Sequence, residues 1–287
     1  MLSGSGKLRF ALPGKGRLAE PAAELLRRSG YRFRARGRHL YATCTNDDIV
    51  FVFVRADDIP VLVDAGVADV GITGSDLVAE RQAEVATLLE LGFGRCRLCV
   101  AVPESYEAAG LEPLAGKTVA TSFPRTTEAF FAAKGVKINA VEMSGSVEIM
   151  VALNMADAIV DIVETGDSLR ENHLKVHAEI GQFQTVLVAS PAAADDPRVA
   201  KLCRRIEGVL VADRYSVLEY NIPASALAEA ETVTPGFESP TVSPLDAEGW
   251  LAVKVMVEKK RVVEAMDRLE AIGATGIFET ELRNCRL

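Results

Sequence analysis

The sequence contains few cysteines, and it lacks any long apolar run. No stretch approaches the roughly 20 consecutive apolar residues of a membrane-spanning helix, so no membrane association is expected. The opening segment, MLSGSGKLRF, lacks the long apolar region of a secretory signal peptide. The five cysteines are scattered and odd in number, which favours a reducing compartment over a disulfide framework. We therefore expect a cytoplasmic protein.

Positive charge is also scarce. The chain has 32 Lys and Arg against 40 Asp and Glu, a net charge of −8. This balance argues against a nucleic-acid or membrane-surface binder. An acidic protein that binds anions must concentrate its basic residues locally, so Lys and Arg in loops become candidates for a binding site.

Residues that bind transition metals are few. Cys96 and Cys99 have a zinc-like or redox spacing, but the surrounding CRLCVAVP predicts a strand, in which residues three apart point to opposite faces. His173 and His177 have a spacing that could bind metal on a helix, but no third ligand with suitable spacing accompanies them. We interpret the cysteines as structural and the histidines as surface residues, and predict no metal site built from protein side chains.

The 287 residues are enough for two or three domains. Short apolar strands alternate with amphipathic helices as far as Ala189, which predicts a mostly parallel α/β architecture with ligands at the carboxyl ends of strands. After a break near Ser190–Asp196, two β–α–β units, Tyr215–Ser243 and Trp250–Leu282, are typical of a ferredoxin-like β-α-β-β-α-β module.

Several loops that follow predicted strands suit a phosphate. Pro13–Leu18 (PGKGRL) opens a helix, its glycines permit close backbone approach, and Lys15 and Arg17 supply positive charge. A turn with solvated charges remains the alternative. The other candidates, each of which could be an ordinary turn, cap or local ion pair, are Val70–Leu77 (VGITGSDL), Thr121–Thr126 with Arg125, Ser144–Glu148, and Arg55.

The segment Ala156–Leu169 (ADAIVDIVETGDSL) gives the clearest signal. Asp161 interrupts a β-branched strand, and a buried carboxylate there needs a partner such as a ribose diol or a magnesium ion bound to it. The hydroxyls of Thr165 and Ser168, with backbone N–H groups at a helix start, suit a dianionic phosphate. Glu164 and Asp167 would then have to point away from it. We predict a site for a ribose 5-phosphate, the alternative being a strand end with a polar turn.

These motifs together resemble the long, histidine-regulated form of ATP phosphoribosyltransferase over nearly the whole chain. The resemblance includes LPGKGRL, ADDIPVLVDAGVADVGITGSDLV, LGFGRCRL, GKTVATSFP, GSVE, ADAIVDIVETGDSL, ESPTVSPL and AIGATGI. Two positions depart from it. Similar enzymes usually have Gly at the position of Asn154 and Thr at the position of Ser168.

The resemblance implies two α/β lobes around a cleft, as in a periplasmic binding protein, with the chain crossing between them twice. A C-terminal ferredoxin-like (ACT-like) βαββαβ domain would follow. We place lobe I at residues 1–96 and 187–212, lobe II with the phosphoribosyl-binding loop at 97–186, and the regulatory domain at 213–287.

The implied reaction transfers the 5-phosphoribosyl group of phosphoribosyl pyrophosphate to N1 of ATP, with Mg²⁺ as cofactor, as the committing step of histidine biosynthesis. The implied catalytic residues are Asp161, Lys15 and Arg17. Those for phosphoribosyl pyrophosphate are Asp161, Glu164, Thr165, Gly166, Asp167, Ser168 and Leu169. Those for ATP or pyrophosphate are Gly14, Lys15, Gly16, Arg17, Arg55, Thr73, Gly74, Arg125 and Glu148.

The resemblance also implies regulation and assembly. Histidine would inhibit by binding to the C-terminal module near Asn221, Phe237, Thr241 and Gly276. AMP would be a second inhibitor, and the chain would form homo-oligomers from dimer to hexamer. Two other functions stay open, a two-lobed small-anion-binding protein and a ligand-sensing regulatory protein.

Overall fold

The computed structural model describes residues 6–34 and 40–286. The first half of the opening segment, on which the expectation about a signal peptide rests, lies outside the described residues. The chain divides into two compact units. The first contains residues up to Glu24 and Arg32–Val199, and the second contains Leu25–Tyr31 and Ala200–Leu287. Within the described part, no helix has the length and apolarity that crossing a membrane requires.

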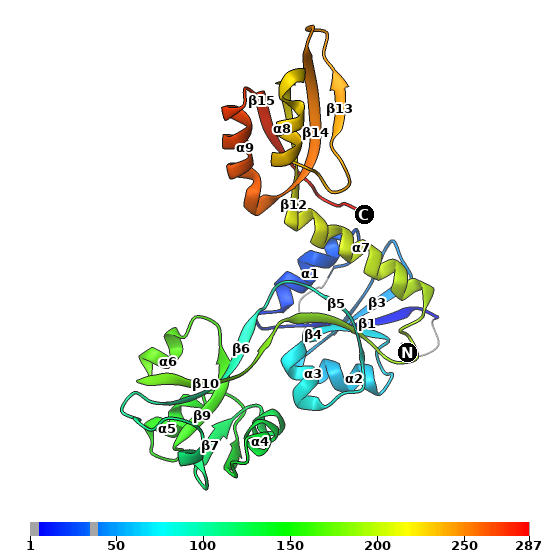
Figure 1. Ribbon diagram of the computed structural model, residues 1–287. Helices are drawn as coiled ribbons and strands as arrows, with labels where there is room; N and C mark the ends of the chain where they lie inside the picture. The colour runs from blue at the N-terminus through cyan, green and yellow to red at the C-terminus, as the bar shows by residue number, and fades with distance from the viewer. Residues whose placement is uncertain (1–5, 35–39, 287) are drawn as a thin grey trace. The chain divides into compact units, whose positions relative to one another are not determined.

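The first unit contains two mixed β-sheets (Figure 1). The part built on the six-stranded sheet is called lobe I here, and its strand order is β2-β3-β1-β4-β11-β5. Its strands are β1 (Leu8–Pro13), β2 (Tyr41–Thr43), β3 (Ile49–Val54), β4 (Val70–Gly74), β5 (Ala86–Glu90) and β11 (Thr185–Ala189). Its helical segments are α1 (Ala19–Arg28), which continues into the second unit, the 3₁₀ turn η1 (Ala56–Asp58), α2 (Ile59–Asp64) and α3 (Ser75–Arg81).

The core of lobe I forms where α2 packs against the sheet. Ile59 and Val63 of α2 are completely buried with Ala11 of β1. Gly71 of β4 makes this close approach possible, because a Cβ atom there would lie 2.5 Å from Cγ2 of Ile59. The parallel neighbours of β1 are β3 and β4, so the loops after these three strands emerge at one edge of the sheet.

The part built on the five-stranded sheet is called lobe II, with strand order β10-β6-β9-β7-β8. Its strands are β6 (Cys96–Pro103), β7 (Thr118–Thr121), β8 (Asn139–Glu142), β9 (Ala158–Val163) and β10 (Leu174–Phe183). Its helical segments are η2 (Glu112–Leu114), α4 (Pro124–Ala133), α5 (Glu148–Ala152) and α6 (Asp167–Glu171). The chain enters lobe II after β5 and returns between β10 and β11, which confirms the two expected crossings.

The expectation of a mostly parallel arrangement is wrong. Four of the nine strand pairings in the two lobes are parallel and five are antiparallel. The antiparallel pairs come largely from β5, β6, β10 and β11, the strands next to the two crossings. The sequence did not predict β10, because its residues LKVHAEIGQF are mostly exposed or half-buried and lack a buried apolar run. His177 therefore lies in a strand, and His173 lies in the turn before it, so the two do not share a helix.

Asn154 has a left-handed backbone, with φ of 56°. Glycine adopts this conformation without steric cost, and asparagine tolerates it better than most side chains. The departure at Asn154 therefore leaves a turn that glycine could also form.

The second unit contains a four-stranded antiparallel sheet of order β13-β14-β12-β15. Its strands are β12 (Tyr215–Pro223), β13 (Thr241–Pro244), β14 (Trp250–Glu258) and β15 (Thr275–Glu281). Its helical segments are α7 (Pro197–Arg214), which begins in the first unit, η3 (Ala224–Ala226), α8 (Leu227–Val233), η4 (Lys259–Arg261) and α9 (Val262–Ala271). Alternate residues of β12, among them Leu218, Tyr220 and Ile222, pack against α8 and α9 in one core. The predicted βαββαβ module is confirmed.

Candidate functional site

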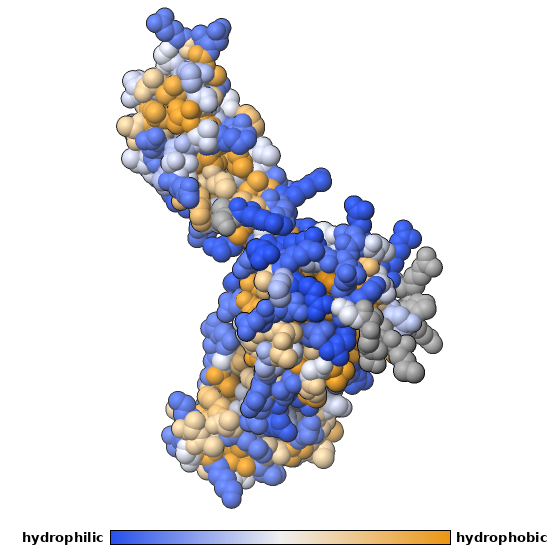
Figure 2. Space-filling model, turned by 90° about the vertical axis from the view of Figure 1, so that its right-hand side faces the viewer, coloured by the Kyte–Doolittle hydropathy of each residue, from blue (hydrophilic) through white to orange (hydrophobic). Residues whose placement is uncertain are grey.

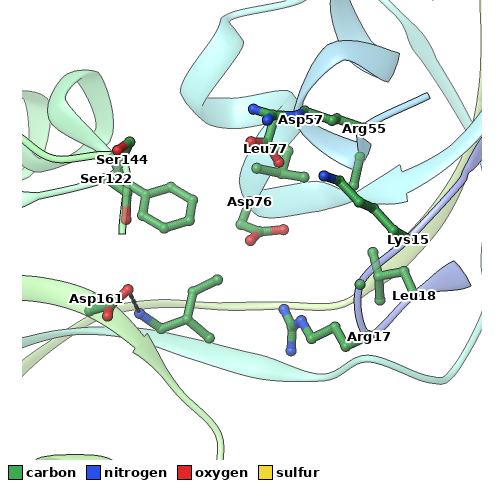
Figure 3. A pocket seen from close by; sticks show the side chains of 14 residues that line it. Lys15, Arg17, Leu18, Arg55, Asp57, Asp76, Leu77, Ser122, Ser144 and Asp161 are labelled. Atoms are coloured by element: carbon green, nitrogen blue, oxygen red, sulfur yellow. Dashed lines mark hydrogen bonds between the residues drawn. The ribbon is translucent and has the colours of Figure 1, made fainter. Parts of the chain in front are cut away.

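A cavity of about 560 Å³ lies in the first unit where segments of both lobes meet (Figure 3). Lobe I contributes the loop after β1, the turn after β3 and the start of α3. Lobe II contributes the loops after β7 and β8 and part of β9. The polar and charged residues that line the cavity are Lys15, Arg17, Arg55, Asp57, Asp76, Ser122, Ser144 and Asp161.

The loop after β1 carries two of these cations. Gly14 donates its N–H to Val54 O at 2.7 Å, which fixes the loop beside β3, and Gly16 has a φ of 84° that favours glycine. The structure thus places Lys15 and Arg17 in the cavity wall, with Arg55 beside them after β3. All three follow the parallel strands of lobe I, as the sequence suggested.

Arg17 is held by two groups from lobe II. Its guanidinium forms an ion pair with Glu164 and donates to Sγ of Cys96 at 3.4 Å. Burial opposes the charge on Arg17, but Cys96 and Glu164 outweigh it, so the pKa of Arg17 is raised. The pKa of the Cys96 thiol is also raised, mainly by burial. Cys96 therefore remains a neutral neighbour of Arg17, consistent with a structural cysteine.

Asp161 lies across the cavity from Arg17 and Lys15 (Figure 3). It comes from β9, where its Oδ1 accepts the N–H of Ile162 at 2.8 Å. Burial raises the pKa of Asp161 to about 6, and the nearby charge of Glu148 adds to this rise, while the Ile162 N–H opposes it. The carboxylate is thus desolvated, and it faces a cavity with no cation bonded to it among the described contacts.

The loop Glu164–Ser168 does not line this cavity, and its polar groups bond to one another and to neighbours. Thr165 donates to Asp167 at 2.6 Å, and Ser168 donates to Glu148 at 2.8 Å. Asp167 also pairs with Arg170, and the pKa of Asp167 is lowered by Thr165 and then by Arg170. Gly166, with φ of 84°, precedes α6, and Leu169 is buried within it.

The remaining phosphate candidates lie around the cavity without lining it. Thr73 is completely buried and donates to Ala56 O at 2.9 Å. Gly74 precedes α3, where a Cβ atom would lie 2.0 Å from Oδ1 of Asp76. Arg125 is exposed and donates to the backbone of Arg81 at 3.3 Å.

Asp76 and Asp57 line the cavity but were not selected from the sequence. Asp76 was considered only as a helix cap, yet it is 3% exposed, and its pKa is raised mainly by burial. The signal for it was an acidic residue just after a buried strand, whereas Asp161 was identified inside one. Among the residues that the structure describes, no group of three or more His, Cys, Asp or Glu side chains is placed to hold a metal ion.

The four residues predicted to bind histidine fall into two places in the C-terminal module. Gly276 lies beside Asn221, because a Cβ atom on Gly276 would be 3.4 Å from Nδ2 of Asn221. Phe237 and Thr241 line a separate cavity of about 540 Å³ together with Lys254.

Comparisons with known proteins match almost the whole chain. The family model for HisG, ATP phosphoribosyltransferase, matches residues 55–208, and the model for its C-terminal domain matches residues 212–284. The ATP phosphoribosyltransferase of Rhodopirellula baltica is 48% identical over 280 residues, covering 98% of this chain and 94% of that protein. That of Salinispora tropica is 42% identical over 282 residues, covering 98% of this chain and all of the relative.

A solved structure is also similar. The ATP phosphoribosyl transferase (HisG:HisZ) complex from Thermotoga maritima contains a chain with 30% identity and a TM-score of 0.64. The match covers 71% of this chain and 98% of that one. Family models and full-length relatives agree, and the chain therefore belongs to the ATP phosphoribosyltransferase family, as a long-form transferase of histidine biosynthesis.

Proposed function

We propose that this chain transfers the 5-phosphoribosyl group of phosphoribosyl pyrophosphate to N1 of ATP, releasing pyrophosphate. The observation that carries the proposal is the cavity in which Lys15, Arg17 and Arg55 face the desolvated carboxylate of Asp161. Such an arrangement suits a ligand with phosphates at one end and a sugar diol at the other. The family's name supplies the identity of the two substrates.

In this reaction the lone pair of adenine N1 forms a bond to C1′ of the ribose as the bond from C1′ to the pyrophosphate oxygen breaks. The configuration at C1′ inverts, and positive charge develops on the ribose ring. N1 already carries its lone pair, so the site needs no strong base. The protein contributes by positioning the two substrates and by neutralising the leaving pyrophosphate, which we assign to Lys15 and Arg17 as catalytic residues.

Asp161 accepts hydrogen bonds from the ribose hydroxyls in this proposal. Its pKa of about 6 leaves the carboxylate mostly ionised at neutral pH. An ionised acceptor in a desolvated position binds a diol more strongly than it would in water. Its negative charge also attracts the positive charge that develops on the ribose in the transition state. Asp161 therefore stabilises the transition state more than the bound substrate.

The loop Thr165–Ser168 holds the 5-phosphate in this proposal. Its hydroxyls would exchange their present acceptors, Asp167 and Glu148, for phosphate oxygens. The positive φ of Gly166 and the first N–H groups of α6 would bring the backbone close to the anion. Ser168 keeps the hydroxyl that threonine supplies in similar enzymes.

Mg²⁺ fits the site if oxygen atoms of the substrates supply most of its ligands. The cavity offers single carboxylates, Asp57, Asp76 and Asp161, rather than a cage of protein ligands. Magnesium commonly binds through one or two carboxylates together with substrate phosphates. When bound, it would supply charge neutralisation to the pyrophosphate, while Lys15 and Arg17 orient that group.

Histidine feedback is assigned to the C-terminal module, and AMP is proposed as a second inhibitor. Asn221 and Gly276 lie together on one part of the sheet, as required for a shared ligand. Asn221 carries no charge, whereas an aspartate would pair with the ammonium group of histidine. We expect Asn221→Asp to lower the inhibition constant for histidine about tenfold, from one added charged hydrogen bond. Unchanged inhibition by histidine in a folded N221D variant would contradict this assignment.

A homo-oligomer, from dimer to hexamer, also belongs to the proposal. Figure 2 shows hydrophobic side chains on the surface of the C-terminal module, and its exposed apolar residues include Val263 at 72%, Phe237 at 54% and Phe278 at 52%. Exposed apolar surface of this kind favours association. Analytical ultracentrifugation with and without histidine measures the state directly, and a monomer under both conditions would contradict the expectation.

The test of the activity is pyrophosphate release from phosphoribosyl pyrophosphate and ATP together, with each substrate alone as control. Turnover should need both substrates and Mg²⁺, and histidine should slow it. Binding of phosphoribosyl pyrophosphate without turnover would favour a small-anion-binding protein. A protein that binds histidine, but neither binds phosphoribosyl pyrophosphate nor turns over, would favour a regulatory protein.

A further inference from the structure

Glu80 of α3, in lobe I, is bonded to the first turn of α4, in lobe II. Its Oε1 accepts the N–H of Arg125 at 3.0 Å, and its Oε2 accepts the N–H and the hydroxyl of Thr126 at 2.9 and 2.8 Å. The residue is only 7% exposed. A carboxylate this buried is costly unless several donors surround it, and here three donors do so.

Helix α4 depends on this contact because it has no cap of its own. Its N-cap residue is Phe123, whose side chain has no acceptor, and the next residue, Pro124, has no N–H. Without Glu80, the N–H groups of Arg125 and Thr126 would have no partner among the described protein groups. Glu80 supplies the missing cap from the other lobe. Its negative charge also interacts favourably with the positive end of the helix dipole.

A second contact on the same face of α3 supports the junction. Leu77, one turn before Glu80, packs against the hydrophobic core of lobe II. Residues three apart on a helix share a face, so α3 presents Leu77 and Glu80 together to lobe II. Arg81 adds a bond, because its carbonyl oxygen accepts from the guanidinium of Arg125 at 3.3 Å.

This junction connects two walls of the candidate active site. Asp76 and Leu77, at the start of α3, line the cavity from lobe I. Ser122 and Phe123, directly before α4, line it from lobe II. In Figure 3, Asp76 and Leu77 lie opposite Ser122 across the cavity. The Glu80 cap is therefore a polar link between the two helices that begin at these walls.

We propose that Glu80 is a positioning residue that fixes the width of the substrate cavity by capping α4 across the two lobes. The expected effect of Glu80 on enzyme kinetics rests on the proposed function, whereas the contact between Glu80 and α4 does not. A cavity of fixed width holds its substrates without a closing movement at this junction, so Glu80 acts on substrate binding.

The test compares Glu80→Gln and Glu80→Ala with Glu84→Gln, an exposed carboxylate just beyond the same helix. Glutamine fills the same space, but either orientation of its amide directs an NH₂ group at an N–H donor. We expect KM for a substrate to rise about tenfold or more in both Glu80 variants, from lost charged hydrogen bonds, with a smaller change in kcat. Glu84→Gln should match the wild type.

A merely structural role would reduce the folded fraction, lowering kcat at unchanged KM. That result in either Glu80 variant, or wild-type kinetics in a folded variant, overturns the proposal. Thr126→Val removes only the hydroxyl that donates to Glu80. It therefore tests the same contact if the Glu80 variants fail to fold. It should raise KM about threefold, and its effect should be non-additive with that of Glu80→Gln. Unchanged KM in Thr126→Val, or additive effects, also overturns the proposal.

Hydrogen exchange separates this proposal from the proposed function. The amides of Arg125 and Thr126 should exchange slowly in the wild-type protein without substrates and at least about tenfold faster in Glu80→Ala. Equal exchange in the two proteins overturns the role of Glu80 whether or not the wild-type protein releases pyrophosphate. Absence of pyrophosphate release by the wild-type protein refutes the proposed function alone.

Discussion

Replacing Asp161 with asparagine should make the protein more stable and less active at neutral pH. The change keeps the shape of the side chain, and the amide oxygen can still accept the N–H of Ile162. It removes the negative charge, which burial destabilises in the folded chain. The pKa rise from 3.8 to about 6 corresponds to at most about 3 kcal/mol of unfolding free energy at pH 7.

The pH dependence follows from the direction of that shift. Above pH 6 the folded wild type carries the desolvated charge at full cost, so D161N should be the more stable protein. As the pH falls through 6, Asp161 takes up a proton in the folded chain before it would in the unfolded chain, and the difference shrinks. Below about pH 4 both states are protonated, and the two proteins should unfold alike.

Urea unfolding of both proteins between about pH 2 and pH 8 measures this difference. Asp157→Asn is the matched control, because Asp157 precedes the same strand and the Thr118 N–H, followed by Lys117, lowers its pKa. That variant should be less stable than the wild type at pH 7, and the loss should disappear as the pH falls below the lowered pKa. A D161N variant that is destabilised at pH 7 would refute the assignment of a desolvated charge.

Activity should change in the opposite direction. If Asp161 binds the ribose diol as proposed, residue 161 without its charge would lose about 1.5–3 kcal/mol of hydrogen bonding, so kcat/KM for phosphoribosyl pyrophosphate should fall about 10- to 100-fold. In the wild type, kcat/KM should fall below a pH near 6 as Asp161 protonates, and D161N should lose that dependence. Substrate phosphates titrate in both proteins, so D161N serves as their control. Wild-type kcat/KM in folded D161N would refute the role of Asp161.

The remaining predictions concern one cation, one core glycine and one turn. Arg17→Ala should lower kcat/KM about 10- to 100-fold through lost contacts to pyrophosphate, measured by pyrophosphate release, and an unchanged rate would remove Arg17 from the site. Gly71→Ala should destabilise lobe I by about 1–3 kcal/mol in thermal unfolding, since its Cβ would lie 2.5 Å from Ile59 Cγ2; equal stability would show that α2 can shift. Asn154→Ala should cost about 1 kcal/mol because its φ is 56°, whereas Asn154→Gly should cost less, and the reverse order would contradict the turn geometry.

The strands with continuous apolar runs could be predicted from the sequence because burial on both faces leaves a strong pattern. The strand before the loop Thr121–Thr126 and the strand that Asp161 interrupts were both predicted, and they are β7 and β9. β2, β5, β8 and β10 were missed, since they are short or partly exposed and carry polar residues. Strand direction was also mispredicted, because a crossing between lobes leaves no local signal.

For the site, the sequence selected Lys15, Arg17, Arg55 and Asp161, and the structure brings these four together. They could be found because each follows or interrupts an apolar strand, where a charged side chain suggests a ligand as well as a local turn or ion pair. Asp76 follows the same rule but was explained as a helix cap. A local explanation therefore hid a residue that turned out to be buried in the cavity wall.

By itself, the sequence determined the α/β order of elements, the C-terminal module, the acidic strand residue and the resemblance to a family, because each rests on spacing along the chain. Only the tertiary structure decided which groups meet across the lobes. The pairing of Arg17 with Glu164 joins residues 147 positions apart, and Glu80 caps a helix that begins more than forty positions later. Such contacts depend on how the two sheets of the first unit are placed. The sequence around Arg17 or Glu80 contains no local pattern that identifies the partner of either residue.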